Sequence, residues 1–143
     1  MRLELTKRAD YAIRAVVALA AVPDERLSVR RIAADRDIPV RFLQQVMTDL
    51  VAAGMADAVA GRTGGYRLTR PTAMISVLDV IEAVEGDSRR RTCVLRAGPC
   101  RTNAVCGVHD VFAATQEAML RELGGATIAS LRPAPRTTTL IQS

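Results

Sequence analysis

The sequence predicts a mainly α-helical protein with a small β wing, in which a winged helix-turn-helix is followed by a long dimerisation helix. Three observations predict this class. Two Phe, two Tyr and no Trp indicate packed helices rather than an aromatic-rich sandwich or barrel. Apolar residues recur at the helical period along most of the chain. A glycine-rich turn at residues 61–65 interrupts this period between two short segments that read as strands.

The first two predicted helices begin at capping residues. Thr6 can cap a helix that runs to about residue 22. Ser28 can cap a second, short helix, which stops near residues 35–38 because Pro39 disfavours helical geometry in the residue before it.

A third helix is predicted from Pro39, which suits a first turn, to Gly54, which suits a C-terminal end. Its apolar positions recur at helical spacing: Leu43, Val46, Met47 and Leu50. Its opposite face carries Arg41, Gln44, Gln45 and Thr48. Arg can pair with guanine and Gln with adenine, so the second and third helices fit a helix-turn-helix that reads the major groove. An ordinary amphipathic helix with a polar outer face fits the same pattern.

A β-hairpin is predicted directly after the third helix, with one strand at residues 55–60 and the other at residues 66–69. A hairpin in this place is a wing. Arg62 at its tip can enter the minor groove, where narrow A·T-rich tracts attract Arg. The predicted DNA-binding set is Ser28, Arg41, Gln44, Gln45, Thr48, Arg62 and Thr63.

Two further helices are predicted beyond the wing. The fourth covers residues 75–86, and the fifth runs from about residue 108 to 123. The fifth carries an apolar stripe of Val111, Phe112, Thr115, Met119 and Leu123. This stripe is long for so small a body, which indicates a homodimer. The predicted units are a DNA-binding domain at 1–71, dimerisation helices at 72–131 with a cysteine-rich loop at 87–106, and a flexible tail at 132–143.

Charge and hydropathy narrow the function classes. The 143 residues include 20 basic and 15 acidic side chains, and the first 70 residues hold 12 of the basic and 8 of the acidic ones. Guanidinium groups bind phosphates bidentately, which fits nucleic acid, although a solvated basic surface gives the same charge. The longest apolar run, Ala15 to Val22, is far too short to cross a bilayer, and no signal-peptide core precedes it. We therefore expect a cytoplasmic protein without a membrane partner.

Three cysteines with the spacing C-x6-C-x5-C lie in the predicted loop: Cys93, Cys100 and Cys106. Their Arg-rich flanks favour thiolates, which bind metal or react with oxidants. Zinc sites normally use closer pairs, so the wide spacing favours an iron–sulfur cluster, with thiol redox chemistry and inert packing as alternatives. Three thiolates leave a fourth ligand to be found, and His109 is the local candidate. One His in the chain and scattered carboxylates offer no catalytic constellation, so we do not expect an enzyme.

The chain resembles the IscR, NsrR and RirA type of iron–sulfur-dependent winged-helix regulators, the Rrf superfamily, over about residues 1–131. The matching stretches lie at residues 1–3, 6–12, 28–33, 42–45, 50–55, 61–68 and 75–82. The most specific of them contains the glycine-rich segment Gly61-Arg62-Thr63-Gly64-Gly65-Tyr66-Arg67-Leu68. The resemblance implies a homodimer that binds pseudo-palindromic, double-stranded promoter DNA, with a 2Fe-2S or 4Fe-4S cluster that controls DNA affinity.

The resemblance also implies that the three cysteines are cluster ligands. In the IscR-like branch, the fourth ligand is a His three residues after the last Cys, which is His109 here. In the NsrR-like branch, it is an acid on the first helix of the other subunit, and Asp10 occupies that place. The residues alone also allow Asp10 to pair with Arg14, four residues further on. Both candidates are present, and we expect Asp10.

The leading interpretation is therefore a cluster-dependent transcription repressor that senses nitric oxide, iron or redox state. A zinc- or thiol-redox-dependent regulator of the same fold is the alternative within this class. An enzyme or a cluster carrier is the alternative outside it.

Overall fold

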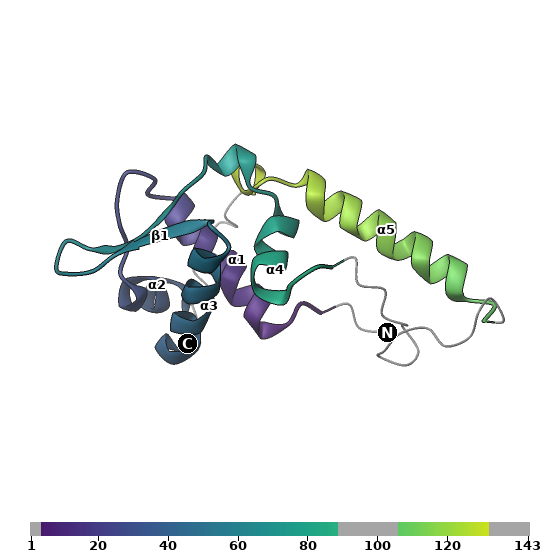
Figure 1. Cartoon of the computed structure of the whole chain (residues 1–143), viewed down its shortest axis with the longest axis horizontal. Coiled ribbons are helices and arrows are strands. Elements are labelled where there is room, and N and C mark those ends of the chain that lie inside the picture. The colour runs from purple at the N-terminus through teal and green to yellow at the C-terminus, as the bar shows by residue number, and fades with distance from the viewer. Residues whose placement is uncertain (1–3, 89–105, 132–143) are drawn as a thin grey trace, which may run out of the picture.

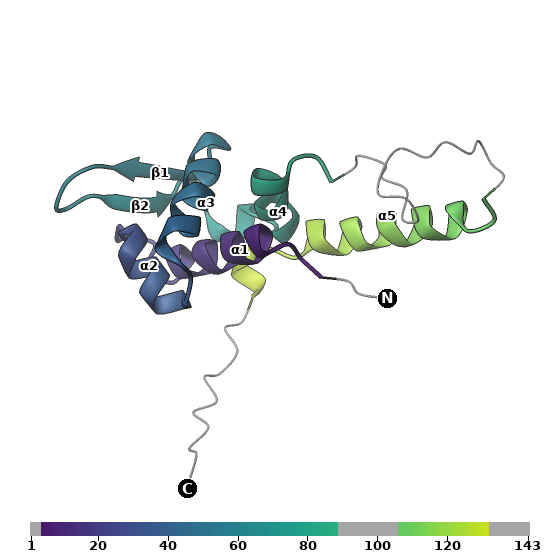
Figure 2. The same cartoon turned by 90° about the horizontal axis from the view of Figure 1, so that it is seen from below.

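The computed structural model describes residues 4–88 and 106–131. The predicted tail and nearly all of the cysteine-rich loop, including Cys93 and Cys100, lie outside the described residues. The elements are α1 (Lys7–Ala20), α2 (Val29–Arg36), α3 (Val40–Ala52), β1 (Ala56–Val59), β2 (Gly65–Leu68), η1 (Thr72–Met74), α4 (Val77–Glu85), α5 (His109–Gly125) and η2 (Ile128–Ser130), where η marks a short 3-10 helix. The hairpin and α5 project from opposite ends of the helical body (Figure 1, Figure 2). No helix in the described ranges has both the length and the apolar character that crossing a bilayer requires.

Helix α1 lies at the centre of the body and contacts α2, α3, α4 and β2. As predicted, Thr6 caps it, with the hydroxyl oxygen accepting the N–H of Ala9 at 3.1 Å. The helix ends at Ala20, slightly earlier than expected. Its buried face consists mostly of small side chains: Ala9, Ala12, Ala15, Val16, Ala18 and Leu19. These small side chains allow several elements to approach the same helix closely, so the core forms around α1.

Helices α2 and α3 form the predicted helix-turn-helix. Ser28 caps α2 by accepting the N–H of Arg31 at 3.1 Å, and Asp37 ends α2 in a left-handed conformation with φ 53°. Pro39 is the N-cap of α3 rather than a residue of its first turn, because the helix begins at Val40. The predicted inward residues of α3 are all buried: Leu43, Val46, Met47 and Leu50. Their burial fixes which face of α3 is turned outward.

Strands β1 and β2 form the predicted antiparallel hairpin, in which Ala56 lies opposite Leu68. Tyr66 and Leu68 are half-buried and Arg67 is exposed, which is the alternation of a strand with one face toward the core. The first strand is shorter than the expected range of residues 55–60, since Met55 is buried in the core and precedes it. The hairpin therefore packs through one side of β2 and leaves its turn away from the core.

A third extended segment, which the sequence did not predict, joins the hairpin. Leu27 donates its N–H to the carbonyl of Tyr66 at 3.0 Å, and Tyr66 donates to the carbonyl of Leu27 at 2.8 Å. Gly65 adjoins this pair with φ +129°, and a Cβ there would lie 2.7 Å from the Leu27 carbonyl oxygen. Glycine is thus required at position 65 by both its backbone conformation and the close approach. The hydrogen bonds of Tyr66 and the close approach of Gly65 hold β2 of the wing against the loop before α2.

Helix α4 begins two residues later than predicted because a capping box precedes it. Ser76 accepts the N–H of Asp79 at 3.0 Å, and the Asp79 carboxylate accepts the N–H of Ser76 at 2.8 Å. Ile75, expected inside the helix, is instead buried in front of it, and its carbonyl accepts the N–H of Ile128 at 2.8 Å. The segment after α5 is thereby held against the start of α4.

The predicted apolar stripe of α5 divides between two environments. Leu123 packs against the core of its own chain, and Leu120, which lies outside the predicted stripe, is the helix's buried residue. Val111 and Met119 remain 66% and 43% exposed. The prediction was therefore wrong in assigning Leu123 to the unpaired face, because the helix turns that side toward α4.

Candidate DNA-binding surface and cluster ligands

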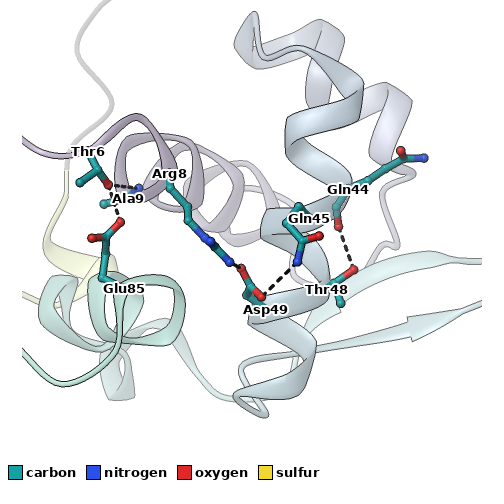
Figure 3. Close-up of polar contacts among 8 residues, drawn as sticks. All are labelled: Thr6, Arg8, Ala9, Gln44, Gln45, Thr48, Asp49 and Glu85. Atoms are coloured by element: carbon teal, nitrogen blue, oxygen red, sulfur yellow. Dashed lines mark hydrogen bonds and ion pairs between the residues drawn. The ribbon is translucent and has the colours of Figure 1, made fainter.

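The outward face of α3 carries the four polar residues predicted to read bases, and all four are exposed: Arg41, Gln44, Gln45 and Thr48. The Thr48 hydroxyl donates to the carbonyl of Gln44 at 2.9 Å, and the Gln45 amide donates to Asp49 at 3.5 Å. The Gln44 amide points away from the Asp49 carboxylate and from the Thr48 hydroxyl (Figure 3). The amide oxygen and nitrogen, the pair of groups that can recognise adenine, therefore lie at an accessible place on the helix.

Asp49 places a negative charge at the edge of this face, which would repel DNA phosphates. Arg8 of α1 forms an ion pair with Asp49 and compensates that charge (Figure 3). The sequence did not predict that Arg8 lies beside the outward face of α3. The two residues are 41 positions apart, so no local pattern in the sequence connects them.

The first turn of α1 also contacts α4. The Thr6 hydroxyl donates to a carboxylate oxygen of Glu85 at 2.5 Å while accepting the N–H of Ala9 (Figure 3). Glu85 is the last residue of α4, and the cysteine-rich loop follows shortly after it in the chain. The beginning of α1 thus contacts α3 on one side and α4, the helix that precedes the cysteines in the chain, on the other.

The structure places Arg62 and Thr63 in the turn of the hairpin, and both are exposed. Within the strands, Arg26 donates to a carboxylate oxygen of Asp57 in β1 at 2.5 Å and to the carbonyl of Gly65 in β2 at 3.3 Å. The hydrogen bond from Arg26 holds the pKa of Asp57 below its ordinary value, against a smaller opposing effect of desolvation. Arg26 therefore connects both strands of the wing to the loop between α1 and α2.

Ser28, the remaining member of the predicted DNA-binding set, is exposed at the start of α2. Its hydroxyl oxygen accepts the N–H of Arg31 in the helix cap, which leaves the hydroxyl hydrogen able to donate to a phosphate. Ser28 directly follows Leu27, the residue that pairs with the wing. The structure thus brings the start of α2 next to strand β2 of the hairpin.

Of the predicted cluster ligands, the structure describes Cys106, His109 and Asp10. Cys106 is half-buried just before α5, and its carbonyl accepts the N–H of His109, the first residue of that helix, at 3.1 Å. A thiol and an imidazole are thus held in one turn, and both are donor types that bind iron. Within the described ranges, no three His, Cys, Asp or Glu side chains gather where one metal ion could be held.

Asp10 forms the ion pair with Arg14 that its spacing allowed. One carboxylate oxygen accepts from Nε of Arg14 at 3.0 Å, and the other lies 2.8 Å from Nη2. Asp10 is 39% exposed and Arg14 is 44% exposed, so the pair contributes little to stability. A ligand role for Asp10 would use a carboxylate lone pair that the ion pair leaves unused, or would replace one of its contacts with Arg14.

The sequence matches the Rrf2 family, described as iron-dependent transcriptional regulators, over residues 5–133. The chain belongs to this family of winged-helix transcriptional regulators. It is 30% identical over 118 residues to an rrf2-like HTH-type transcriptional regulator of Rhodobacter capsulatus, covering 76% of this chain and 79% of that protein. It is also 36% identical over 86 residues to the regulator IscR of Cereibacter sphaeroides, covering 58% of this chain and 56% of that protein.

Solved structures show the same fold. CymR of B. subtilis, titled the global cysteine regulator, aligns with a TM-score of 0.75 at 20% identity and covers 90% of this chain and 95% of its own. IscR of T. potens aligns with a TM-score of 0.71 at 23% identity and covers 90% of this chain and 85% of its own. An oxidized form of Staphylococcus aureus CymR aligns with a TM-score of 0.73 at 20% identity, and the alignment covers 93% of this chain and 100% of the CymR chain. These comparisons confirm the predicted winged-helix class.

Proposed function

We propose that this protein is a homodimeric repressor that binds promoter DNA through α3 and the wing. The observation that supports this most directly is the exposed face of α3. It presents Arg41, Gln44 and Gln45 outward, while Asp49, the acidic residue at its edge, is paired with Arg8. The hairpin is held in place beside this helix-turn-helix by the backbone pairing with the loop before α2.

A binding series on a duplex enriched from random sequence tests the DNA-binding proposal. We expect Arg41→Ala to cost about 1–3 kcal/mol on the enriched site, because a bidentate base contact is lost. We expect Arg62→Ala to weaken binding and to reduce its salt dependence. Arg121→Ala is the matched control, since it removes an exposed Arg from α5. Unchanged affinity for both Arg41→Ala and Arg62→Ala would overturn the assignment of α3 and the wing.

We further propose that Cys93, Cys100 and Cys106 hold an iron–sulfur cluster, 2Fe-2S or 4Fe-4S, that makes DNA affinity respond to nitric oxide, iron or redox state. Support comes from the thiol and imidazole in one turn before α5 and from the family's description as iron-dependent. The cluster would supply a redox- and ligand-sensitive group on the segment that joins α4 to α5 in the chain. Anaerobically purified protein should be brown and contain iron and sulfide, and Cys100→Ser should lose both. Full iron and sulfide content in Cys100→Ser would exclude Cys100 as a ligand.

Thiol-based regulation is the second candidate, favoured by the structural likeness to CymR, of which one solved form is titled oxidized. The same preparation separates the candidates. Colourless, iron-free protein whose DNA affinity changes reversibly with thiol oxidation would support thiol chemistry. Colourless protein with stoichiometric zinc would support a zinc-stabilised regulator.

A further inference from the structure

The apolar side chains on the DNA-binding side of the molecule have no role in the surface described so far. Helix α3 carries two large exposed apolar residues, and both lie in its first turn: Val40 is 39% exposed and Phe42 is 63% exposed. The other Phe of the chain, Phe112, is half-buried on α5. Phe42 therefore presents most of its ring to solvent at the end of the helix where base contacts of a helix-turn-helix concentrate.

The surroundings of Phe42 suit DNA better than a second copy of the chain. Phe42 directly follows Arg41 and lies three residues before Gln45, which places it beside Gln45 on the helix surface. The exposed apolar residues of α5 are not continuous with it, since α5 projects from the end of the body opposite the hairpin (Figure 1, Figure 2). An aromatic ring among base-reading side chains faces the one apolar group in the major groove, the C5-methyl of thymine.

Resting on the proposed DNA binding, we propose that Phe42 is a specificity-determining residue that contacts a thymine methyl group. The methyl belongs to a base pair next to the one that Gln45 reads. The contact removes the ring and the methyl from water and adds no hydrogen bond, so it favours T·A over C·G at that position. Arg41 and Gln45 supply polar readout, and Phe42, beside Gln45 on the helix surface, supplies the apolar readout.

The test uses the full-length protein and a duplex enriched from random sequence, compared with the same duplex in which uracil replaces each thymine in turn. Uracil lacks only the methyl group, so the exchange isolates this contact. We expect wild-type protein to lose about fourfold in affinity at one uracil position, the factor that corresponds to one buried methyl. Phe42→Ala should bind the thymine duplex more weakly and show no loss at that position. Phe42→Leu, which keeps an apolar side chain, should retain part of the discrimination.

Met74→Ala is the matched control, because it removes a 69% exposed apolar side chain from η1 and should leave the uracil effect intact. Equal sensitivity of wild type and Phe42→Ala to every uracil would overturn the inference while leaving DNA binding in place. Failure to enrich any duplex would overturn the proposed function and this inference together. Sedimentation without DNA should be the same for wild type and Phe42→Ala. Dissociation of Phe42→Ala into monomers would assign Phe42 to an interface between copies and overturn the DNA contact.

Discussion

Arg8 on α1 and Asp49 on α3 form an ion pair that connects the central helix of the body to the edge of the proposed DNA-binding face. Asp49 also accepts from the Gln45 amide, so a single carboxylate orients one polar side chain of that face while its charge is compensated from another helix. We therefore expect the pair to influence DNA binding more than folding. Exposed ion pairs contribute at most about 1 kcal/mol to stability, whereas an uncompensated carboxylate near phosphates opposes binding directly.

We expect Arg8→Ala to weaken specific DNA binding by about fivefold, the factor that about 1 kcal/mol of charge repulsion produces. Adding Asp49→Asn should restore most of the affinity, because the repelling charge is then gone. Lys7→Ala is the control, since it removes the same charge from the neighbouring, exposed residue. Fluorescence anisotropy on one enriched duplex measures all four proteins. An unrestored double variant would show that Arg8 acts through some contact other than Asp49.

The Arg26–Asp57 pair predicts a pH dependence of the free energy of unfolding. Arg26 lowers the pKa of Asp57 in the folded state, so the stabilisation is fully present above the ordinary Asp pKa and is lost as pH falls through the lowered value. Wild type should therefore be more stable than Asp57→Asn at neutral pH, and the difference should shrink in strong acid. Urea unfolding across this range measures it, with Asp24→Asn, in the same loop as Arg26, as the control. A difference that grows on acidification would contradict the assignment.

The exposed apolar face of α5 predicts that the protein is a dimer that this helix holds together. Met119→Arg should produce monomers, because a charge would be placed in the interface without a partner. Ala113→Arg adds the same charge at an exposed position of α5 on the side of the helix turned away from Val111 and Met119, and it should leave the dimer intact. Light scattering at tens of micromolar protein distinguishes the species. Wild-type protein that is monomeric at that concentration would exclude the proposal.

The fourth cluster ligand can be decided by comparing Asp10→Ala with His109→Ala after anaerobic cluster loading. We expect Asp10→Ala to change the cluster spectrum and to reduce the difference in DNA affinity between cluster-bound and cluster-free protein. Arg14→Ala should retain the cluster, since it only releases the Asp10 carboxylate from its ion pair. Asp110→Ala, which removes an exposed carboxylate beside His109, is the control. Loss of the cluster in His109→Ala with an unaffected Asp10→Ala would make His109 the ligand.

Local patterns in the sequence were sufficient for most of the fold. Helical periodicity identified the buried positions of α3, and the caps Thr6 and Ser28 marked where two helices begin, because capping depends on neighbours three residues away. The capping box at Ser76 and Asp79 has an equally local signature, Ser-x-x-Asp, and would have placed the start of α4 correctly. These elements are predictable because the interactions that define them lie within one turn.

Contacts between distant parts of the chain were not predictable in this way. The pairing of Leu27 with Tyr66 and of Arg8 with Asp49 depends on how helices and strands pack, which periodicity does not encode. The same applies to α5, where the apolar pattern alone did not show that Leu123 faces the core while Met119 stays exposed. For the proposed cluster site, sequence spacing named the three cysteines and His109, and the family resemblance named Asp10. The structure adds the turn that joins Cys106 to His109.

The close approach of Gly65 to Leu27 has a consequence for how regulators of this kind diverge. Backbone geometry requires glycine at position 65, where the wing meets the loop before α2, since a side chain there would collide with the Leu27 carbonyl. Arg62 and Thr63 at the tip, like Gln44 on α3, are exposed, and substitutions at such positions usually change stability by less than about 0.5 kcal/mol. Under the proposed mode of DNA binding, a duplicated copy of this gene can therefore acquire a new target sequence through a few substitutions at the tip and on α3 while its scaffold stays intact.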